Sequence, residues 1–220
     1  MLTISIDGAS RRNGKPDCVA AGGVFICSPD HSVENNRATT ISAAEHESTN
    51  QRGEMLALIE ALKYLTQCSE DACIVTDSEY LFNAMTKEWY SRWEVNGWRT
   101  ADGSPVKNKD LWERVSSLVD IILGDINFYH IKGHLIPFGK ATASNLLAHD
   151  PTGYSLYLEA LEKFDTLAPT KETVFAYAQE CSVKNNGFAL APETFRNFVA
   201  LNVVADAVAT ESVEEADREI

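Results

Sequence analysis

The first residues of the chain alternate between apolar and polar side chains. In "LTISID" (residues 2–7) every second side chain is leucine or isoleucine, and this period of two predicts a β-strand with one buried face. The apolar segments "AGGVFICS" (21–28) and "NRATTIS" (36–42) follow closely. We therefore expect three consecutive strands in an antiparallel meander.

A helical period replaces this alternation after residue 50. In "GEMLALIEALKYL" (53–65) apolar side chains recur every three or four residues, and Thr49 and Asn50 are candidate N-caps. Two later segments return to the strand pattern. We predict strands at 72–77 and 126–133, and helices at 78–89, 109–123 and 141–149.

A strand–helix–strand crossover joins the meander to the fourth strand, so strands one and four can lie parallel and adjacent. The predicted fold class is α/β: a five-stranded mixed sheet, with a three-strand antiparallel meander plus parallel strands, flanked by helices. Ligands of such sheets gather at the carboxyl ends of the strands. Asp7 and Asp77 are both expected at such ends.

A turn signal at Asp150-Pro151 and Gly153 suggests a domain boundary. Beyond it the chain carries five Lys and Arg against twelve Asp and Glu, and three helices are predicted, at 154–167, 170–181 and 192–209. We therefore expect a domain at 1–150 and an acidic helical C-terminal extension at 151–220.

The net charge of −13 argues against nucleic-acid binding by bulk electrostatics, but it leaves room for metal ions and a local basic patch. No apolar run approaches the ~20 residues of a membrane helix, and no basic region precedes the first apolar run, so we expect no signal peptide and a cytoplasmic protein. The five cysteines form no CxxC pair, which favours reduced structural thiols.

Three carboxylates are expected to converge: Asp7, Asp77 and Glu54, which we place in the first turn of the intervening helix. Each has a structural explanation alone, as a turn residue, a cap and a favourable charge at a helix N-terminus. Together they would repel one another unless cations lie among them. Such oxygen clusters suit Mg²⁺ or Mn²⁺, and two ions ~4 Å apart could activate a water and stabilise the leaving oxygen of a phosphodiester.

Five motifs, in order along roughly residues 2–149, resemble the type 1 ribonucleases H. They are "IDGASRRNGKP…GGVFI", "TNQRGEMLALIEAL", "TDSEYL", the handle-like "WEVNGWRTADGSPVKNKDLWERV" of bacterial members, and "HIKGH". The resemblance implies an endonuclease that hydrolyses the RNA strand of RNA–DNA hybrids and leaves 3′-hydroxyl and 5′-phosphate ends. It also implies a monomer, and a replication protein as a candidate partner of the extension.

The resemblance makes Asp7, Glu54 and Asp77 ligands of two Mg²⁺ or Mn²⁺ ions. It makes His134, in the loop "KGHLIPFG", the residue that assists proton movement or product departure.

Substrate contacts follow from the same resemblance. Asn50 and Gln51 would read the minor groove, where a hybrid presents 2′-hydroxyls on one strand only. Asn13, Thr49 and Arg52 would hold backbone phosphates, the first two on the DNA strand.

The handle adds Trp93, Trp98 and Lys107 as candidate substrate contacts. Aromatic side chains at helical spacing are also common packing anchors. Packing and substrate stacking are equally good interpretations of Trp93 and Trp98.

One position departs from the family. The family places a fourth carboxylate in the helix after the histidine loop, in a pattern like "ADxLA", and here "ASNLLA" puts Asn145 at that place. A neutral amide there would bind the second metal weakly. Ser144 or Asp150 is the counterpart if the loop register differs. Either the protein works with three carboxylates, or the chain carries an inactivating Asp→Asn change.

Two other function classes stay open. With one ligand missing, the domain could be a non-cleaving hybrid-binding or scaffold module of a replication complex. A resolvase- or transposase-like nuclease could share the fold, although the handle and "TNQR" argue against it.

Overall fold

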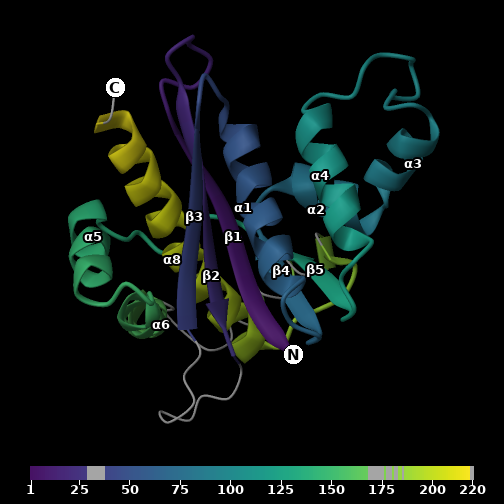
Figure 1. The fold of residues 1–220 in the computed structure, drawn as a ribbon. Helices are drawn as coiled ribbons and strands as arrows, with labels where there is room; N and C mark the ends of the chain where they lie inside the picture. The colour runs from purple at the N-terminus through teal and green to yellow at the C-terminus, as the bar shows by residue number, and fades with distance from the viewer. Residues whose placement is uncertain (29–37, 168–175, 177–179, 181–182, 185, 219–220) are drawn as a thin grey trace.

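The computed structural model describes residues 1–28, 38–167, 176, 180, 183–184 and 186–218. Its five strands form one sheet in the order β3-β2-β1-β4-β5 (Figure 1). The strands are β1 (Leu2–Arg11), β2 (Val19–Cys27), β3 (Ala38–His46), β4 (Ala72–Thr76) and β5 (Ile126–His130).

The pairing confirms the predicted mixed sheet. β1 to β3 form the antiparallel meander, and β1 pairs parallel with β4, which pairs parallel with β5. β1 is longer than predicted and runs past Asp7 to Arg11. Asp7 nevertheless lies one residue beyond the parallel register, which ends at Ile6 opposite Thr76.

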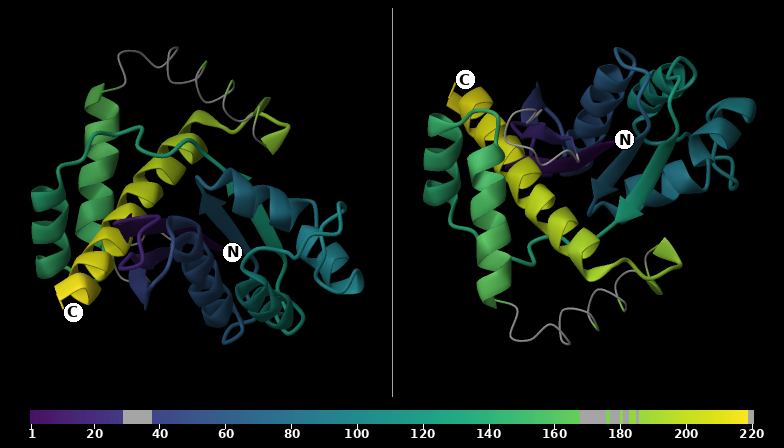
Figure 2. Two further views of the ribbon diagram at one scale, coloured as in Figure 1. Left: turned by 90° about the horizontal axis from the view of Figure 1, so that it is seen from above. Right: turned by 90° about the horizontal axis from the view of Figure 1, so that it is seen from below.

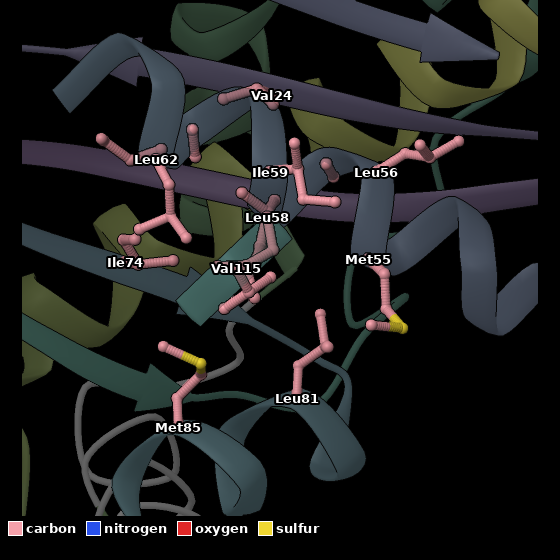
Figure 3. Packing of buried hydrophobic residues seen from close by; sticks show 14 of the residues in the cluster. Val24, Met55, Leu56, Leu58, Ile59, Leu62, Ile74, Leu81, Met85 and Val115 are labelled. Carbon is pink, nitrogen blue, oxygen red and sulfur yellow. The ribbon is translucent and has the colours of Figure 1, made fainter. Parts of the chain in front are cut away.

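One face of the sheet is covered by α1 (Asn50–Leu65), with α4 (Lys109–Val119) packed against α1. Figure 3 shows the apolar side chains that fill this layer. The helix predicted at 78–89 is in fact two, α2 (Glu79–Thr86) and α3 (Trp89–Val95). Glu88 separates them because its left-handed backbone, at φ +50°, interrupts the helix.

The opposite face is covered by α8 (Pro192–Arg218), which packs against β1, β2 and β3. Figure 2 shows α8 between the sheet and α6 (Tyr154–Leu167), with α5 (Lys140–His149) beside α6. Every residue of β2 is buried because helices cover both of its faces. A β-carbon on Gly23 would lie 2.2 Å from the carbonyl oxygen of Ala205, so only glycine allows α8 to approach this closely.

This packing corrects the division expected at residue 150. Phe25 and Val75 of the sheet share one apolar core with Phe195 and Val204 of α8. The apolar side chains on this face of the sheet stay out of water only while α8 covers them. α8 therefore belongs to the same domain as the sheet. The helix predicted at 170–181 lies outside the described residues. No helix in the described part of the chain could span a membrane.

Candidate active site

Asp7 lies in the central strand β1 and is buried. Its Oδ1 accepts a hydrogen bond from the backbone N–H of Gly8, at 2.7 Å, and its Oδ2 accepts one from Nδ2 of Asn202, at 3.2 Å. Asn202 belongs to α8. The first predicted carboxylate is therefore held from both the strand and the last helix.

Glu54 approaches Asp7 because α1 lies directly on β1. A β-carbon on Gly8 would come within 2.4 Å of the backbone nitrogen of Glu54. Thr49 caps α1 as predicted, and Glu54 lies in the second turn rather than the first. Its carboxylate accepts hydrogen bonds from the hydroxyl of Ser78 and, at 3.3 Å, from Nδ2 of Asn50.

Asp77 follows β4 directly, on the loop that leads into α2. Nε2 of His130 lies 3.0 Å from the backbone carbonyl oxygen of Asp77 and hydrogen-bonds to it. A β-carbon on Gly133 would lie 1.9 Å from Oδ2 of Asp77. The histidine loop therefore passes directly over this carboxylate.

A fourth carboxylate, Asp206 of α8, joins these three and was missed in the sequence. Its charge raises the pKa of both Asp7 and Asp77, and the charge of His134 acts on it in turn. Asp206 lies one helical turn beyond Asn202, on the same face of α8. The signal was present: "ADAVA" (205–209) fits the pattern "ADxLA" better than "ASNLLA" does.

Asp206 therefore replaces Asn145 as the candidate for the position of the fourth ligand. Asn145 is exposed on α5, and its backbone carbonyl accepts a hydrogen bond from Nδ1 of His149 at 2.8 Å. The two alternatives are also engaged elsewhere. Ser144 donates to Glu211, and Asp150 accepts from the backbone N–H of Ser155 at the start of α6.

The four carboxyl groups carry more negative charge than the protein around them neutralises. Burial, and then the charges of Asp77 and Asp206, raise the pKa of Asp7 well above its usual value. Burial also raises the pKa of Glu54, Asp77 and Asp206, although the charge of His134 works against the rise in the last two. Burial is the main physical cause in all four, and repulsion from neighbouring carboxylates adds to it in Asp7, Glu54 and Asp77.

An all-oxygen cluster with unneutralised charge fits Mg²⁺ or Mn²⁺. As placed, no three His, Cys, Asp or Glu side chains of the described residues surround a common point closely enough to hold a metal ion. Oxygens of Asp7 and Glu54 are instead occupied by hydrogen-bond donors of the protein. Metal binding would exchange some of these bonds for metal contacts.

His134 lies exposed in the loop after β5, in a left-handed backbone conformation with φ +54°. Its charge acts on Asp77 and Asp206. The structure therefore places this histidine beside the carboxylates, on the solvent side.

The candidate phosphate- and groove-binding residues cluster near the start of α1. Oδ1 of Asn13 accepts from the backbone N–H of Asn50 at 3.3 Å, and Oε1 of Gln51 accepts from Nδ2 of Asn108 at 3.1 Å. Asn13 and Thr49 are exposed.

Arg52 does not present a free guanidinium for phosphate. It makes two hydrogen bonds to the carboxylate of Glu45 and two to that of Asp110, all between 2.7 and 2.9 Å. These bonds raise the pKa of Arg52 further. Arg52 therefore links β3 to α4. Its predicted role as a phosphate contact is corrected to a structural role.

In the handle, Trp93 packs against Trp89 and Trp112, with ring centroids 6.0 and 5.5 Å apart. Trp98 is half-buried and also packs on the main core. The packing interpretation therefore fits both residues. Lys107 is exposed.

The RNase H family model matches residues 1–148. The chain belongs to the ribonuclease H family. It is 36% identical over 134 residues to the Ribonuclease H of Clostridium botulinum (strain Hall), which covers 60% of this chain and 83% of that relative. It is 46% identical over 136 residues to the Ribonuclease H of Nitratidesulfovibrio vulgaris (strain DP4), which covers 60% and 78%.

Solved structures agree on the fold of this ribonuclease H. The solution structure of the PFV RNase H domain has a TM-score of 0.52 at 22% identity and covers 70% of this chain and 94% of that one. LC9-RNase H1, a type 1 RNase H with the type 2 active-site motif, has a TM-score of 0.52 at 21% identity and covers 61% and 64%. The family match ends before α8, so it does not include Asp206.

Proposed function

We propose that this ribonuclease H hydrolyses the RNA strand of RNA–DNA hybrids with two Mg²⁺ or Mn²⁺ ions held by Asp7, Glu54, Asp77 and Asp206. The products would carry 3′-hydroxyl and 5′-phosphate ends. The observation that carries the proposal is the convergence of four carboxylates, one buried and three partly buried, from β1, α1, the end of β4 and α8. Asp206 supplies the ligand that Asn145 could not.

When bound, the divalent ions would polarise the attacking water and offset the charge on the departing 3′ oxygen. The protein's own groups have separate tasks. Asn202 orients Asp7, and Ser78 orients Glu54. His134, exposed beside Asp77 and Asp206, would move a proton at the departing oxygen.

Selectivity for hybrids would come from the start of α1. Asn50 and Gln51 would contact the minor groove, where 2′-hydroxyls mark the RNA strand, and Asn13 and Thr49 would hold phosphates of the DNA strand. Lys107 would add a handle contact. Because the net charge is −13, we expect modest affinity with a steep dependence on salt.

Cleavage of an end-labelled RNA–DNA hybrid tests the proposal, with duplex RNA, duplex DNA and EDTA as controls. We expect metal-dependent cuts in the RNA strand only, with 3′ ends that a polymerase extends directly. Binding without cleavage would favour the scaffold alternative. Cleavage of duplex DNA would favour a resolvase- or transposase-like nuclease instead.

A further inference from the structure

The loop that carries His134 (residues 131–139, hereafter the histidine loop) borders a hollow on the side of α8. The hollow, of about 590 Å³, is lined by His134 and Phe138 on one side and by Ser10, Asp206 and Thr210 on the other. The hollow therefore separates part of the loop from the segment of α8 that carries Asp206.

The loop is held instead through its apolar residues. Ile136 is buried in the core that contains Leu156 and Ala160 of α6 and also Val204 of α8. Phe138 packs against the same core, and Nζ of Lys163, on α6, lies 4.9 Å from the centroid of its ring. A cation at this distance from an aromatic face is attracted to it.

This support comes from a part of the chain that the family match does not include. The match ends at residue 148, whereas α6 spans Tyr154–Leu167. Figure 2 shows α6 packed along α8. α6 also contributes Tyr157 to the core, 5.9 Å from the ring of Phe25 in β2, and its contact with the histidine loop gives it a second candidate role.

We propose that α6 is a positioning element for His134, acting through Phe138 and Lys163, so that the loop holds the imidazole over the carboxylates. The inference rests on the proposed function, because it assigns His134 a part in turnover. Phe138 and Lys163 are positioning residues in this scheme. A histidine that moves a proton contributes only while it is held within reach of the reacting atoms.

A double-mutant cycle with His134→Ala tests the inference. Phe138→Ala should lower kcat about tenfold, and Lys163→Met about threefold, the scale of a single cation–π contact. KM should stay within about twofold in both. In the His134→Ala background neither substitution should lower kcat further, since there is no imidazole left to position.

Two further variants are controls. Phe138→Tyr keeps the ring and should retain wild-type kcat. Lys184→Met removes an exposed lysine from a segment remote from Phe138 in sequence and should change nothing. Equal losses of kcat with and without His134 would overturn the inference, because Phe138 would then act on the fold in general. Lys163→Met keeps the test valid if Phe138→Ala fails to fold.

Amide hydrogen exchange gives a readout that does not depend on activity. Exchange across residues 132–138 should accelerate in Phe138→Ala and Lys163→Met and stay unchanged in Lys184→Met. Unchanged exchange in all three variants would overturn the inference that α6 holds the histidine loop. A wild-type chain that cleaves no hybrid would overturn the proposed function. The exchange rates would still show separately whether α6 holds the histidine loop.

Discussion

The side-chain amide of Asn202 donates a hydrogen bond to the carboxylate of Asp7 across 195 residues of sequence. Both side chains are buried, with 5% and 7% of their surface exposed. The bond joins the first strand to the last helix inside the candidate site. Because Asp206 lies one turn further along α8, the same helix both orients one carboxylate and supplies another.

Asp206→Asn should abolish most of the activity, and Asn145→Asp should have no effect. The first change removes a unit charge from the carboxylate cluster, and losing a group aimed at developing charge typically costs on the order of 10²–10³ in rate. The second adds a charge on an exposed face of α5. Single-turnover cleavage of a saturating hybrid measures both effects.

Hybrid affinity should be nearly unchanged in both variants, because the proposed substrate contacts lie elsewhere. A rate gain in Asn145→Asp would show that Asn145, not Asp206, occupies the ligand position. Wild-type turnover in Asp206→Asn would show that α8 contributes no ligand to the metal site.

Gly133→Ala should inactivate the enzyme while leaving it folded. The added β-carbon would lie 1.9 Å from Oδ2 of Asp77, and a flexible carboxylate can turn away more readily than the backbone can shift. Asp77 would then be misplaced for metal binding. Mn²⁺ titration by calorimetry and the cleavage rate should both show the loss, with melting temperature little changed.

Gly139→Ala is the matched control in the same loop. Its β-carbon would meet nothing nearer than Oγ1 of Thr142, at 3.6 Å, and its φ of −75° suits alanine. This variant should cleave at the wild-type rate. Equal inactivation by both substitutions would mean that Gly133 is needed for the conformation of the loop rather than for the position of Asp77.

Much of the sheet could be predicted because its signals are local. The alternation in β1 and the helical period in α1 each span a few residues, and the crossover rule then places β4 beside β1. Asp7, Glu54 and Asp77 became candidate site residues in this way. The left-handed backbone at Glu88, which splits the predicted helix in two, has no comparable local signal.

The fourth carboxylate was not predicted because its neighbours are determined by packing between residues that are far apart in the sequence. The family pattern predicts it soon after the histidine loop, and Asn145 lies there, whereas α6 and the residues after it separate Asp206 from that loop. The ion pairs of Arg52 were missed for the same reason. Glu45 is close in sequence, but Asp110 reaches Arg52 only after α1 packs on α4.

Asp7→Asn should stabilise the fold in metal-free buffer at neutral pH. The pKa of Asp7 is higher in the folded state than in the unfolded chain, so the folded state binds more protons between those two values. The free energy of unfolding contributed by this group therefore falls as pH rises through that window, from about 4 upward. The uncharged asparagine has no such penalty.

Urea unfolding at several pH values in EDTA measures this effect. The stability advantage of Asp7→Asn over wild type should be largest near neutral pH and shrink toward pH ~4, where Asp7 is protonated in the folded state. Saturating Mn²⁺ should reverse the order, because cations bind the folded wild type selectively. An advantage that does not vary with pH would mean that the charge of Asp7 is not the cause.

A chain that ends at residue 168 should not fold, although the sequence alone suggests that the extension at 151–220 is separable. Truncation removes α8 and exposes the face of β2 that it covers. Burial of Phe195, Phe198, Leu201 and Val204 contributes about 6–12 kcal/mol by the usual values for large apolar side chains, as much as the net stability of a typical domain. Circular dichroism and soluble yield should show an unfolded or insoluble product, whereas the full-length Asp206→Asn variant, which lacks the carboxylate but keeps the helix, should remain folded. A soluble, cooperatively melting truncated chain would show instead that the sheet is stable with α8 absent.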